Sequence, residues 1–175
     1  MMGVDFGSKW SKVGESGEYP RRDVNSGGEG VLMFLGTHEP RLDDKGRLVL
    51  PAKFREGLAA GVVLTKGQDR SLVLWPMVEF SAYADRLREA SRTDARVRSY
   101  LRVFFSSAFD QVPDKQGRIN IPNSLRDYAG LDREVVVVGA DTTIEVWDSV
   151  TWNTYLTNAE PKFADISEEV VPGVF

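Results

Sequence analysis

The stretch Asp43-Asp44-Lys45-Gly46-Arg47-Leu48-Val49-Leu50-Pro51-Ala52-Lys53-Phe54-Arg55 decides the fold, because a close copy of it follows 71 positions later. The copy reads Asp114-Lys115-Gln116-Gly117-Arg118-Ile119-Asn120-Ile121-Pro122-Asn123-Ser124-Leu125-Arg126. Aspartate, glycine, arginine, proline and the last arginine recur at identical spacing, with aliphatic residues matched at alternate positions. A match of this length predicts two copies of one unit of about 70 residues.

The correspondence continues downstream with one residue inserted. It pairs Gly67 with Gly139, Asp69 with Asp141, Trp75 with Trp147, Val78 with Val150, and Tyr83 with Tyr155. We therefore expect five parts: a leader, a first repeat, an inter-repeat helix, a second repeat and an acidic C-terminal tail. Their ranges are 1–32, 33–90, 91–106, 107–158 and 159–175.

The leader differs in composition from the rest of the chain. Gly, Ser, Glu and Arg dominate residues 1–32 and no apolar period is visible, so we expect disorder. Gly27-Gly28-Glu29 is encoded by GGN-GGN-GAR, which resembles a ribosome-binding site a few codons before Met33. We expect Met33 to be the native start; the alternative is a genuine flexible tail.

The bulk composition excludes several classes of site. The chain has no cysteine and a single histidine, His38, so neither a Ser/His/Asp or Cys/His arrangement nor a histidine-rich metal site can be built. Walker A and Rossmann glycine patterns are also missing. We therefore expect no enzyme activity, metal, cofactor or small-molecule substrate. We expect His38 on a strand or the surface, and Trp75, Trp147 and Trp152 in packing contacts.

The net charge of −4 argues mildly against a nucleic-acid partner, but the charges are segregated. Residues 41–55 and 86–102 are rich in Arg and Lys, whereas the tail from Glu160 is acidic, so local positive potential remains. We interpret the arginines of 86–102 as a solvated face or subunit salt bridges before DNA contacts. The apolar stretch Val31–Leu35 is too short for a membrane span, and we expect a cytoplasmic protein.

Each repeat predicts a strand, a hairpin turn, a return strand, a brief helix, two more strands and a helix, which together make an α+β fold. Gly46 and Gly117 supply the positive φ of the tight turns. Pro51 and Pro122 suit the first position of the brief helices. The later turns are expected at 66–69 and 139–141, Asp148 as a helix cap and Gly130 as a helix stop. Val97, Leu101, Phe104, Phe105 and Ala108 mark an amphipathic inter-repeat helix, started by Ser91, Thr93 or Asp94.

The turn at Asp43 has a physical use beyond its fold. A carboxylate four residues before Arg47 can accept backbone N–H bonds and hold the guanidinium, with Gly46 at the apex. A held arginine loses less entropy when it binds a phosphate or a base edge. The second copy offers Asp114, Gly117 and Arg118, and Lys45 and Lys115 are the apical cations. The alternative is that each pair only staples its turn.

These motifs, with Met33–Gly36 and Ile144–Trp147, resemble the MraZ family of bacterial transcriptional regulators, found at the head of the division and cell wall gene cluster. The resemblance runs from Met33 to roughly Phe163. It implies two AbrB-like (SpoVT-AbrB) swapped-hairpin β units with pseudo-two-fold symmetry, which interleave strands into one closed β structure. It also implies a ring-shaped homo-oligomer, an octamer or a dodecamer.

The resemblance implies sequence-specific binding to double-stranded DNA in the chain's own promoter region, with a nucleoid location. It makes Arg47 a DNA contact, matched by Arg118 in the second repeat. Arginine pairs bidentately with guanine in the major groove, and we expect Lys45 and Arg41 to assist. The expected phosphate contacts are Lys53, Arg55, Lys115 and Arg126. Gln116 replaces Lys45, and Asn123 and Ser124 replace Ala52 and Lys53, so the second turn is expected either to grip DNA less strongly or to serve mainly the fold.

Two further hypotheses follow. The resemblance implies operators of TGGG boxes one helical turn apart; codons for Trp10, Val13-Gly14 and Ser16-Gly17 can spell such boxes, so residues 10–17 are read as the chain's own operator. The rival function is an antitoxin-like protein-binding module, in which the tail Glu160–Phe175 wraps a partner.

Overall fold

The computed structural model describes residues 33–90 and 92–166. Our expectations for the leader, for the operator hypothesis, for Ser91 as a helix start and for the end of the tail lie outside these residues. The described part has an α+β fold, as the sequence predicts. Its helices are all too short or too polar to cross a membrane.

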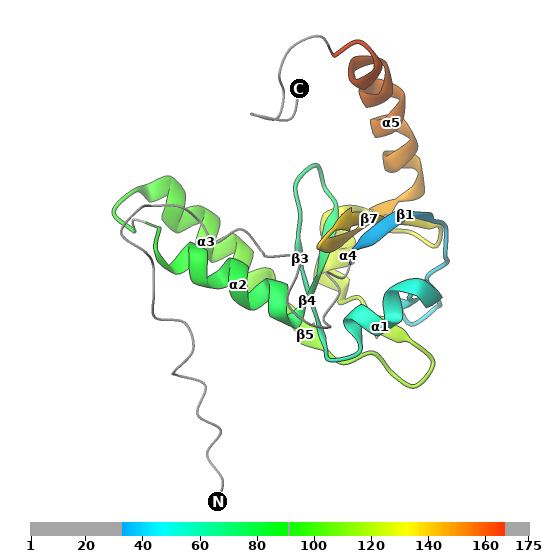
Figure 1. Ribbon diagram of the computed structural model, residues 1–175, viewed down its shortest axis with the longest axis horizontal. Coiled ribbons are helices and arrows are strands. Elements are labelled where there is room, and N and C mark those ends of the chain that lie inside the picture. Colours follow the sequence, from blue (N-terminus) through cyan, green and yellow to red (C-terminus); the bar gives the residue numbers. More distant parts are fainter. Residues whose placement is uncertain (1–32, 91, 167–175) are drawn as a thin grey trace, which may run out of the picture. The chain divides into compact units, whose positions relative to one another are not determined.

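The elements alternate along the chain as two similar series (Figure 1). The strands are β1 Phe34–His38, β2 Arg47–Val49, β3 Val62–Lys66, β4 Leu72–Pro76, β5 Phe109–Gln111, β6 Arg118–Asn120, β7 Val135–Asp141 and β8 Thr143–Asp148. The helices are the 3₁₀ turn η1 Ala52–Phe54, then α1 Arg55–Leu58, α2 Met77–Arg88, α3 Ala95–Ser107, α4 Asn123–Ala129 and α5 Ser149–Ala164.

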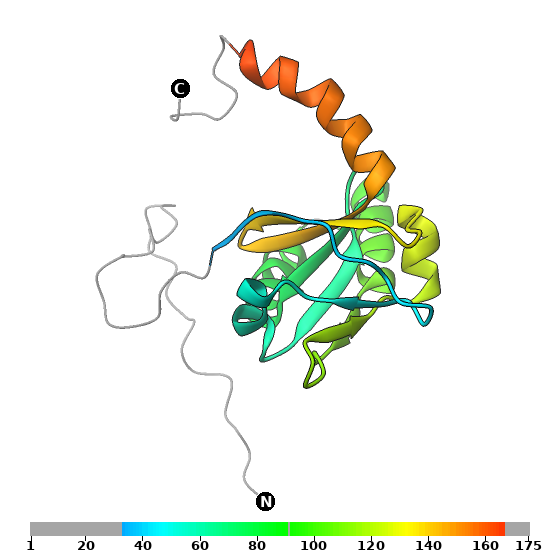
Figure 2. The same cartoon turned by 90° about the vertical axis from the view of Figure 1, so that its right-hand side faces the viewer.

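The two repeats interleave their strands. The larger sheet has six strands in the order β1-β7-β8-β4-β3-β5, and every neighbouring pair is antiparallel. Exchanging each strand for its counterpart in the other repeat gives the same order read in reverse, which is the expected pseudo-two-fold symmetry. The strands β2 and β6 form a separate two-stranded ribbon (Figure 2). One closed β structure was the expectation; the described strands instead make a six-stranded sheet with β1 and β5 at its edges, and this ribbon.

The ribbon and the sheet share one hydrophobic core. Leu48, Leu50, Ile119 and Ile121 are buried almost completely, and they belong to the same cluster as residues of β3, β4, β7 and β8. The alternation predicted from the sequence is confirmed, because Val49 between the two leucines is 42% exposed. Burying each of these side chains contributes about 1.5–3 kcal/mol. The ribbon is therefore held to the sheet by its inner face, and its outer face remains accessible.

Several local predictions are confirmed. Gly46 and Gly117 have φ of 74° and 71°, and Gly130 ends α4 in the left-handed conformation with φ 59°. Asp94 caps α3 by accepting a bond from Arg96 N, and the Asp148 carboxylate accepts a bond of 3.0 Å from Thr151 N at the start of α5.

Two predictions were wrong in detail. Pro51 and Pro122 precede their helices as N-caps, because their ψ values of 135° and 148° are extended. The turn expected at 139–141 lies further on, since β7 continues to Asp141. The longer strand pairs with β1, and Phe34 lies opposite Asp141. A Cβ on Gly139 would lie 2.4 Å from the backbone carbon of Phe34, so this close pairing requires glycine there.

The tryptophans and His38 lie where the sequence placed them. Trp75 and Trp147 are in β4 and β8, and their rings contact aromatic residues of the helices that follow. Trp75 Nε1 donates to Thr65 Oγ1 over 2.9 Å, which satisfies its polar group. His38 ends β1 and packs edge-on against Phe54, with ring centroids 5.1 Å apart.

Candidate functional site

The first charged turn is built around the carboxylate of Asp43. Its Oδ1 accepts the backbone N–H groups of Lys45 and Arg47, both over 2.9 Å. Its Oδ2 accepts the guanidinium of Arg47 through Nε and Nη2, both over 2.6 Å. Gly46 N closes the turn by donating to Asp43 O over 2.9 Å. One carboxylate therefore fixes both the backbone of the turn and the direction of the arginine.

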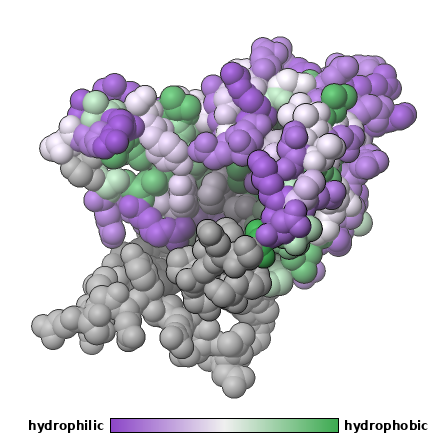
Figure 3. Space-filling view, turned by 90° about the horizontal axis from the view of Figure 1, so that it is seen from above, coloured by the Kyte–Doolittle hydropathy of each residue, from purple (hydrophilic) through white to green (hydrophobic). Residues whose placement is uncertain are grey.

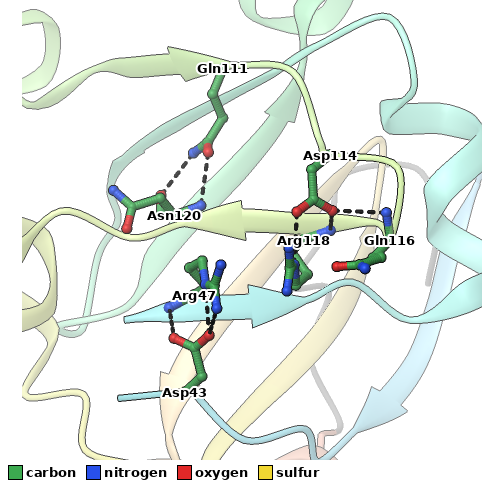
Figure 4. A network of polar contacts seen from close by, with 7 residues as sticks. All are labelled: Asp43, Arg47, Gln111, Asp114, Gln116, Arg118 and Asn120. Atoms are coloured by element: carbon green, nitrogen blue, oxygen red, sulfur yellow. Dashed lines mark hydrogen bonds and ion pairs between the residues drawn. The ribbon is translucent and has the colours of Figure 1, made fainter. Parts of the chain in front are cut away.

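The second turn repeats this arrangement (Figure 4). Asp114 Oδ1 accepts the N–H groups of Gln116 and Arg118 over 2.9 Å and 3.0 Å, and Oδ2 accepts Arg118 Nε over 2.7 Å. Gly117 N donates to Asp114 O over 2.8 Å. Gln116 occupies the place of Lys45, so the lysine of the second turn stands one residue earlier, at Lys115.

The contacts shift the pKa of both carboxyl groups downward. For Asp43, the side-chain hydrogen bond from Arg47 comes first and its backbone bond second, and together they lower the pKa to about 2. For Asp114, the backbone bond from Arg118 leads, followed by its side chain, and the pKa again lies below the ordinary value of 3.8. Both carboxylates are charged at neutral pH, so both arginines keep their partners there.

The two arginines share the outer face of the ribbon. Arg47 lies opposite Asn120 and Val49 opposite Arg118, while Leu48 and Ile119 between them are buried. The arginines are thus diagonal neighbours on adjacent strands, each beside its own aspartate. Their side chains are 34% and 30% exposed, respectively. The face presents two guanidinium groups close together, which the spacing of 71 residues in the chain does not reveal.

Bracing does not use all the donors of these arginines. Arg47 turns its Nε–Nη2 edge to Asp43, and its Nη1 makes no hydrogen bond within the residues described. Because a guanidinium has five N–H groups, the terminal Nη1–Nη2 edge can still donate two parallel bonds. Among the described residues Arg118 donates through Nε alone, so both of its terminal nitrogens can still donate. The arrangement can hold a planar acceptor pair such as a phosphate or a guanine edge.

The repeats also contact each other's turns. A Cβ built on Gly46 would lie 2.6 Å from Cζ of Arg126, and one built on Gly117 would lie 2.5 Å from Nε of Arg55. Each turn glycine is buried under an arginine of the other repeat. Both glycines therefore meet two requirements, a positive φ and room for a guanidinium.

Two of the remaining predicted cations, Arg41 and Lys53, have local partners. Arg41 pairs with Glu134, with Nε 2.8 Å from Oε1. Lys53 donates to Leu35 O and lies over the ring of Phe54. Lys45 and Lys115 are exposed at the turns beside the ribbon. The structure brings six of the eight predicted cations to the two turns: Lys45, Arg47, Arg55, Lys115, Arg118 and Arg126. The other two, Arg41 and Lys53, pair with Glu134 just before β7 and with Leu35 in β1.

Three residues near the turns were missed. Asn120 stands at the outer face, and the side chain of Gln111 holds its backbone by two bonds of 2.8 Å, one to N and one to O. The repeat alignment offered a signal, since Asn120 occupies the position of Val49. Arg133 lies beside the first turn, with Nη1 3.9 Å from Asp44 Oδ1, and it lines with Arg126 a hollow of about 250 Å³. No sequence signal marked Arg133, because it lies in the segment before β7 where the inserted residue breaks the alignment of the repeats.

Within residues 33–90 and 92–166, no group of three or more His, Asp or Glu side chains is placed to hold a metal ion.

Comparisons with known proteins agree with the doubled sequence. A family model described as "MraZ protein, putative antitoxin-like" matches twice, at residues 33–103 and 104–172. A relative from Salinispora arenicola (strain CNS-205), named transcriptional regulator MraZ, is 61% identical over 142 residues, 81% of this chain and 100% of the relative. Relatives with the same name from Clavibacter michiganensis subsp. michiganensis (strain NCPPB 382) and Micrococcus luteus (strain ATCC 4698) are 57% and 54% identical over 143 residues, 82% of this chain and 100% of each relative. The chain belongs to the MraZ family.

Proposed function

We propose that the chain is a transcriptional regulator that binds double-stranded DNA in a sequence-specific way through the outer face of the β2–β6 ribbon and its two turns. The observation that carries this proposal is the pair of braced arginines, Arg47 and Arg118, side by side on an accessible two-stranded ribbon. The relatives are named transcriptional regulators, which agrees with a role in transcription and gives no reason to expect catalysis.

A two-stranded ribbon has dimensions that fit the major groove of B-DNA. Seated there, the terminal edge of Arg47 would donate to O6 and N7 of a guanine, the commonest specific contact between proteins and DNA. Arg118 would do the same from the second strand. Because each guanidinium is already held by its aspartate, little side-chain entropy is lost on binding.

The lysines would contribute affinity without sequence choice. Lys45 and Lys115 are exposed at the turns that flank the ribbon, where the phosphate backbone of a groove-bound duplex would run. Contacts with phosphate release counterions and make binding salt-dependent. Lys53 and Arg41 are further candidates, although each would have to exchange a present partner, Leu35 O or Glu134, for a phosphate.

A ring-shaped homo-oligomer is supported by an asymmetry between the repeats. In the first repeat, Trp75, Phe80 and Tyr83 form an aromatic group that Phe104 of α3 covers, with ring centroids of 6.1, 6.0 and 5.4 Å from that of Phe104. Each member of this group therefore has a second helix beside it.

The second repeat has the corresponding group, but within the described residues no ring of a second helix lies against it. Its accessible members are Trp152 and Tyr155 on α5, because Trp147 in β8 is itself buried. Trp147, Trp152 and Tyr155 stand at the corresponding positions, and their ring centroids lie 5.2–5.8 Å apart. Within the described residues, however, α5 has no fully buried residue. The helix projects away from the sheet (Figures 1 and 2). Apolar surface is also visible at the α2–α3 end, on the left in Figure 3. The exposed apolar side chains of α3 include Tyr100, Val103 and Phe105.

The uncovered group on α5 would accept a second copy's α2–α3 face, and repetition of this head-to-tail contact closes a ring. Several ribbons on one ring would then bind boxes spaced one helical turn apart. Linked weak contacts gain through effective concentration. The proposed targets are phased TGGG-type repeats upstream of the chain's own gene in the division and cell wall cluster, with the protein in the nucleoid.

The test is a titration of purified full-length protein against its own upstream DNA at two salt concentrations, beside a duplex with scrambled boxes. The proposal expects tight, steeply salt-dependent binding to the native duplex and at least tenfold weaker binding to the scrambled one. Equal affinity for the two duplexes at both salt concentrations would contradict sequence-specific binding.

The family description also mentions an antitoxin-like character, which favours a second candidate function. In that case the segment that follows Glu160 would bind a protein partner. Deleting residues 160–175 separates the two functions, since a regulator that reads DNA with its ribbon keeps its DNA affinity, whereas a tail-dependent binder loses its partner.

A further inference from the structure

We infer that Arg126 and Arg55 are positioning residues that act across the repeats. Arg126 of the second repeat holds the turn that orients Arg47, and Arg55 of the first repeat holds the turn that orients Arg118. The inference rests on the proposed function for its effect on DNA binding. Its structural half, that each turn is held by the opposite repeat, can be tested without DNA.

The first contact joins α4 to the first turn. A Cβ on Gly46 would lie 2.6 Å from Cζ, 2.8 Å from Nε and 2.8 Å from Nη1 of Arg126. The guanidinium therefore lies flat against the backbone of Gly46 and buries it. Arg126 is itself held by a hydrogen bond from its Nη2 to Asn123 Oδ1. Its Nε is buried and has no hydrogen-bond partner in the described part of the chain.

The second contact repeats the first in the opposite direction. A Cβ on Gly117 would lie 2.5 Å from Nε and 2.7 Å from Cδ of Arg55. Arg55 Nε donates to Leu50 O over 3.0 Å. The same relationship between a helix arginine and a turn glycine thus occurs twice, on different backbones and with different hydrogen-bond partners for the arginine. This recurrence argues that the contact is a feature of the repeat.

Backbone bonds extend each contact in the same crosswise sense. Ile121 N donates to Gly46 O over 3.0 Å, and Leu50 N donates to Gly117 O over 2.8 Å. On one side, each turn glycine is bonded to the residue that follows the other repeat's ribbon strand. On the other side, it is covered by the other repeat's arginine. Gly46 immediately precedes Arg47, so a shift of this glycine moves the atoms from which Arg47 projects.

The precision that base recognition needs gives these contacts their function. A bidentate bond from arginine to guanine requires the guanidinium in one plane and direction, and small displacements weaken it. The aspartate fixes the arginine relative to its turn, and the opposite arginine fixes the turn relative to the ribbon. We expect a loosened turn to lower affinity for the preferred base more than affinity for DNA in general.

A positioning role differs from the phosphate contact predicted from the sequence for these two residues. A phosphate contact depends on positive charge, so Arg126→Lys would preserve it, and removing the charge would reduce the salt slope by about one unit. Positioning depends on the flat guanidinium, which lysine lacks. Arg126→Lys and Arg55→Lys therefore test positioning at constant charge, and each is the matched control of the other.

The first experiment is hydrogen exchange on the full chain without DNA, monitored at amides that the aspartates bind. Arg126→Lys is expected to speed exchange at Lys45 and Arg47 by about threefold or more, and to leave Gln116 and Arg118 unchanged. Arg55→Lys is expected to do the reverse. Equal changes at both turns, or changes only in the turn of the same repeat, would overturn the inference.

The second experiment is a double-mutant cycle on binding to the upstream duplex. Arg126→Lys is expected to weaken binding about 3- to 30-fold in the wild-type and Arg118→Ala backgrounds, and to have little further effect once Arg47 is alanine. Arg55→Lys should instead lose its effect in the Arg118→Ala background. Equal effects of Arg126→Lys in all backgrounds would overturn the crosswise assignment.

Two glycine variants test the inference in case the arginine variants fail to fold. Gly46→Ala pushes the Arg126 guanidinium aside without altering its charge, whereas Gly130→Ala imposes a similar left-handed strain where nothing lies within 4 Å. The inference expects weaker DNA binding for Gly46→Ala than for Gly130→Ala, measured well below the melting temperature of both variants. If the exchange result holds and no arginine variant alters DNA binding, the proposed function fails and the crosswise contact stands.

Discussion

Arg47 lies directly opposite Asn120 in the β2–β6 ribbon, so the best candidate for base recognition in the first repeat has a residue of the second repeat as its nearest cross-strand neighbour. The same register places Arg118 opposite Val49. The outer face of the ribbon therefore belongs to neither repeat alone. Duplication supplied two similar turns, and the interleaved fold brought them onto one surface.

The brace at Asp43 predicts an acid-dependent stability. Its pKa is lowered from the ordinary 3.8 to about 2 in the folded chain. A lowered pKa stabilises the fold fully above pH 3.8, and this contribution is lost as the pH falls towards 2. Thermal melting between pH 2 and pH 6 should show a shallower acid-side slope for Asp43→Asn than for the wild type. Asp44→Asn is the control, because its side chain is 95% exposed, and its curve should run parallel to the wild type. Parallel curves for Asp43→Asn would contradict the brace.

The burial of the ribbon's inner face predicts that neighbouring residues differ sharply in how much they stabilise the fold. Leu48 is fully buried and lies opposite Ile119, whereas Val49 is 42% exposed. Leu48→Ala should lower the free energy of unfolding by about 2–5 kcal/mol through lost burial and a cavity. Val49→Ala should change it by about 0.5 kcal/mol or less. Urea denaturation measures both, and similar losses would mean that the ribbon is not anchored through Leu48.

The uncovered aromatic group on α5 predicts which variants alter assembly. Replacing Trp152 and Tyr155 together by alanine should shift the full-length protein to smaller species in light scattering coupled to size-exclusion chromatography. Asn153→Ala, an exposed change on the same helix, should leave the size unchanged. An unaltered molecular size in the double variant would remove α5 from the proposed interface.

Much of this fold could be predicted from the sequence because its signals are local. Turn glycines, alternating aliphatic residues and the cap at Asp148 each act within a few residues, and the structure confirms them. The end of β7 was misjudged because its length is set by pairing with β1, about 100 residues away in the chain. Pattern within a segment carries no information about such a partner.

The candidate site shows the same division. The bonds that Arg47 donates to Asp43 span four residues and could be predicted from the sequence. The contact of Arg126 with Gly46 depends on how the repeats interleave, so the sequence did not suggest it. Arg55 and Arg126 were predicted to contact phosphate because only their charge could be read from the sequence.

The central claim is that Arg47 contacts DNA, and the most direct measurement is the affinity of Arg47→Ala for the chain's own upstream duplex. We predict that Arg47→Ala loses about 1–3 kcal/mol of binding free energy per engaged contact. It should also discriminate less against duplexes in which the guanines are replaced. Arg70→Ala, which removes the same charge from the exposed turn between β3 and β4, should bind like the wild type. If Arg47→Ala binds the upstream duplex as tightly as the wild type, the ribbon is not the DNA-binding surface.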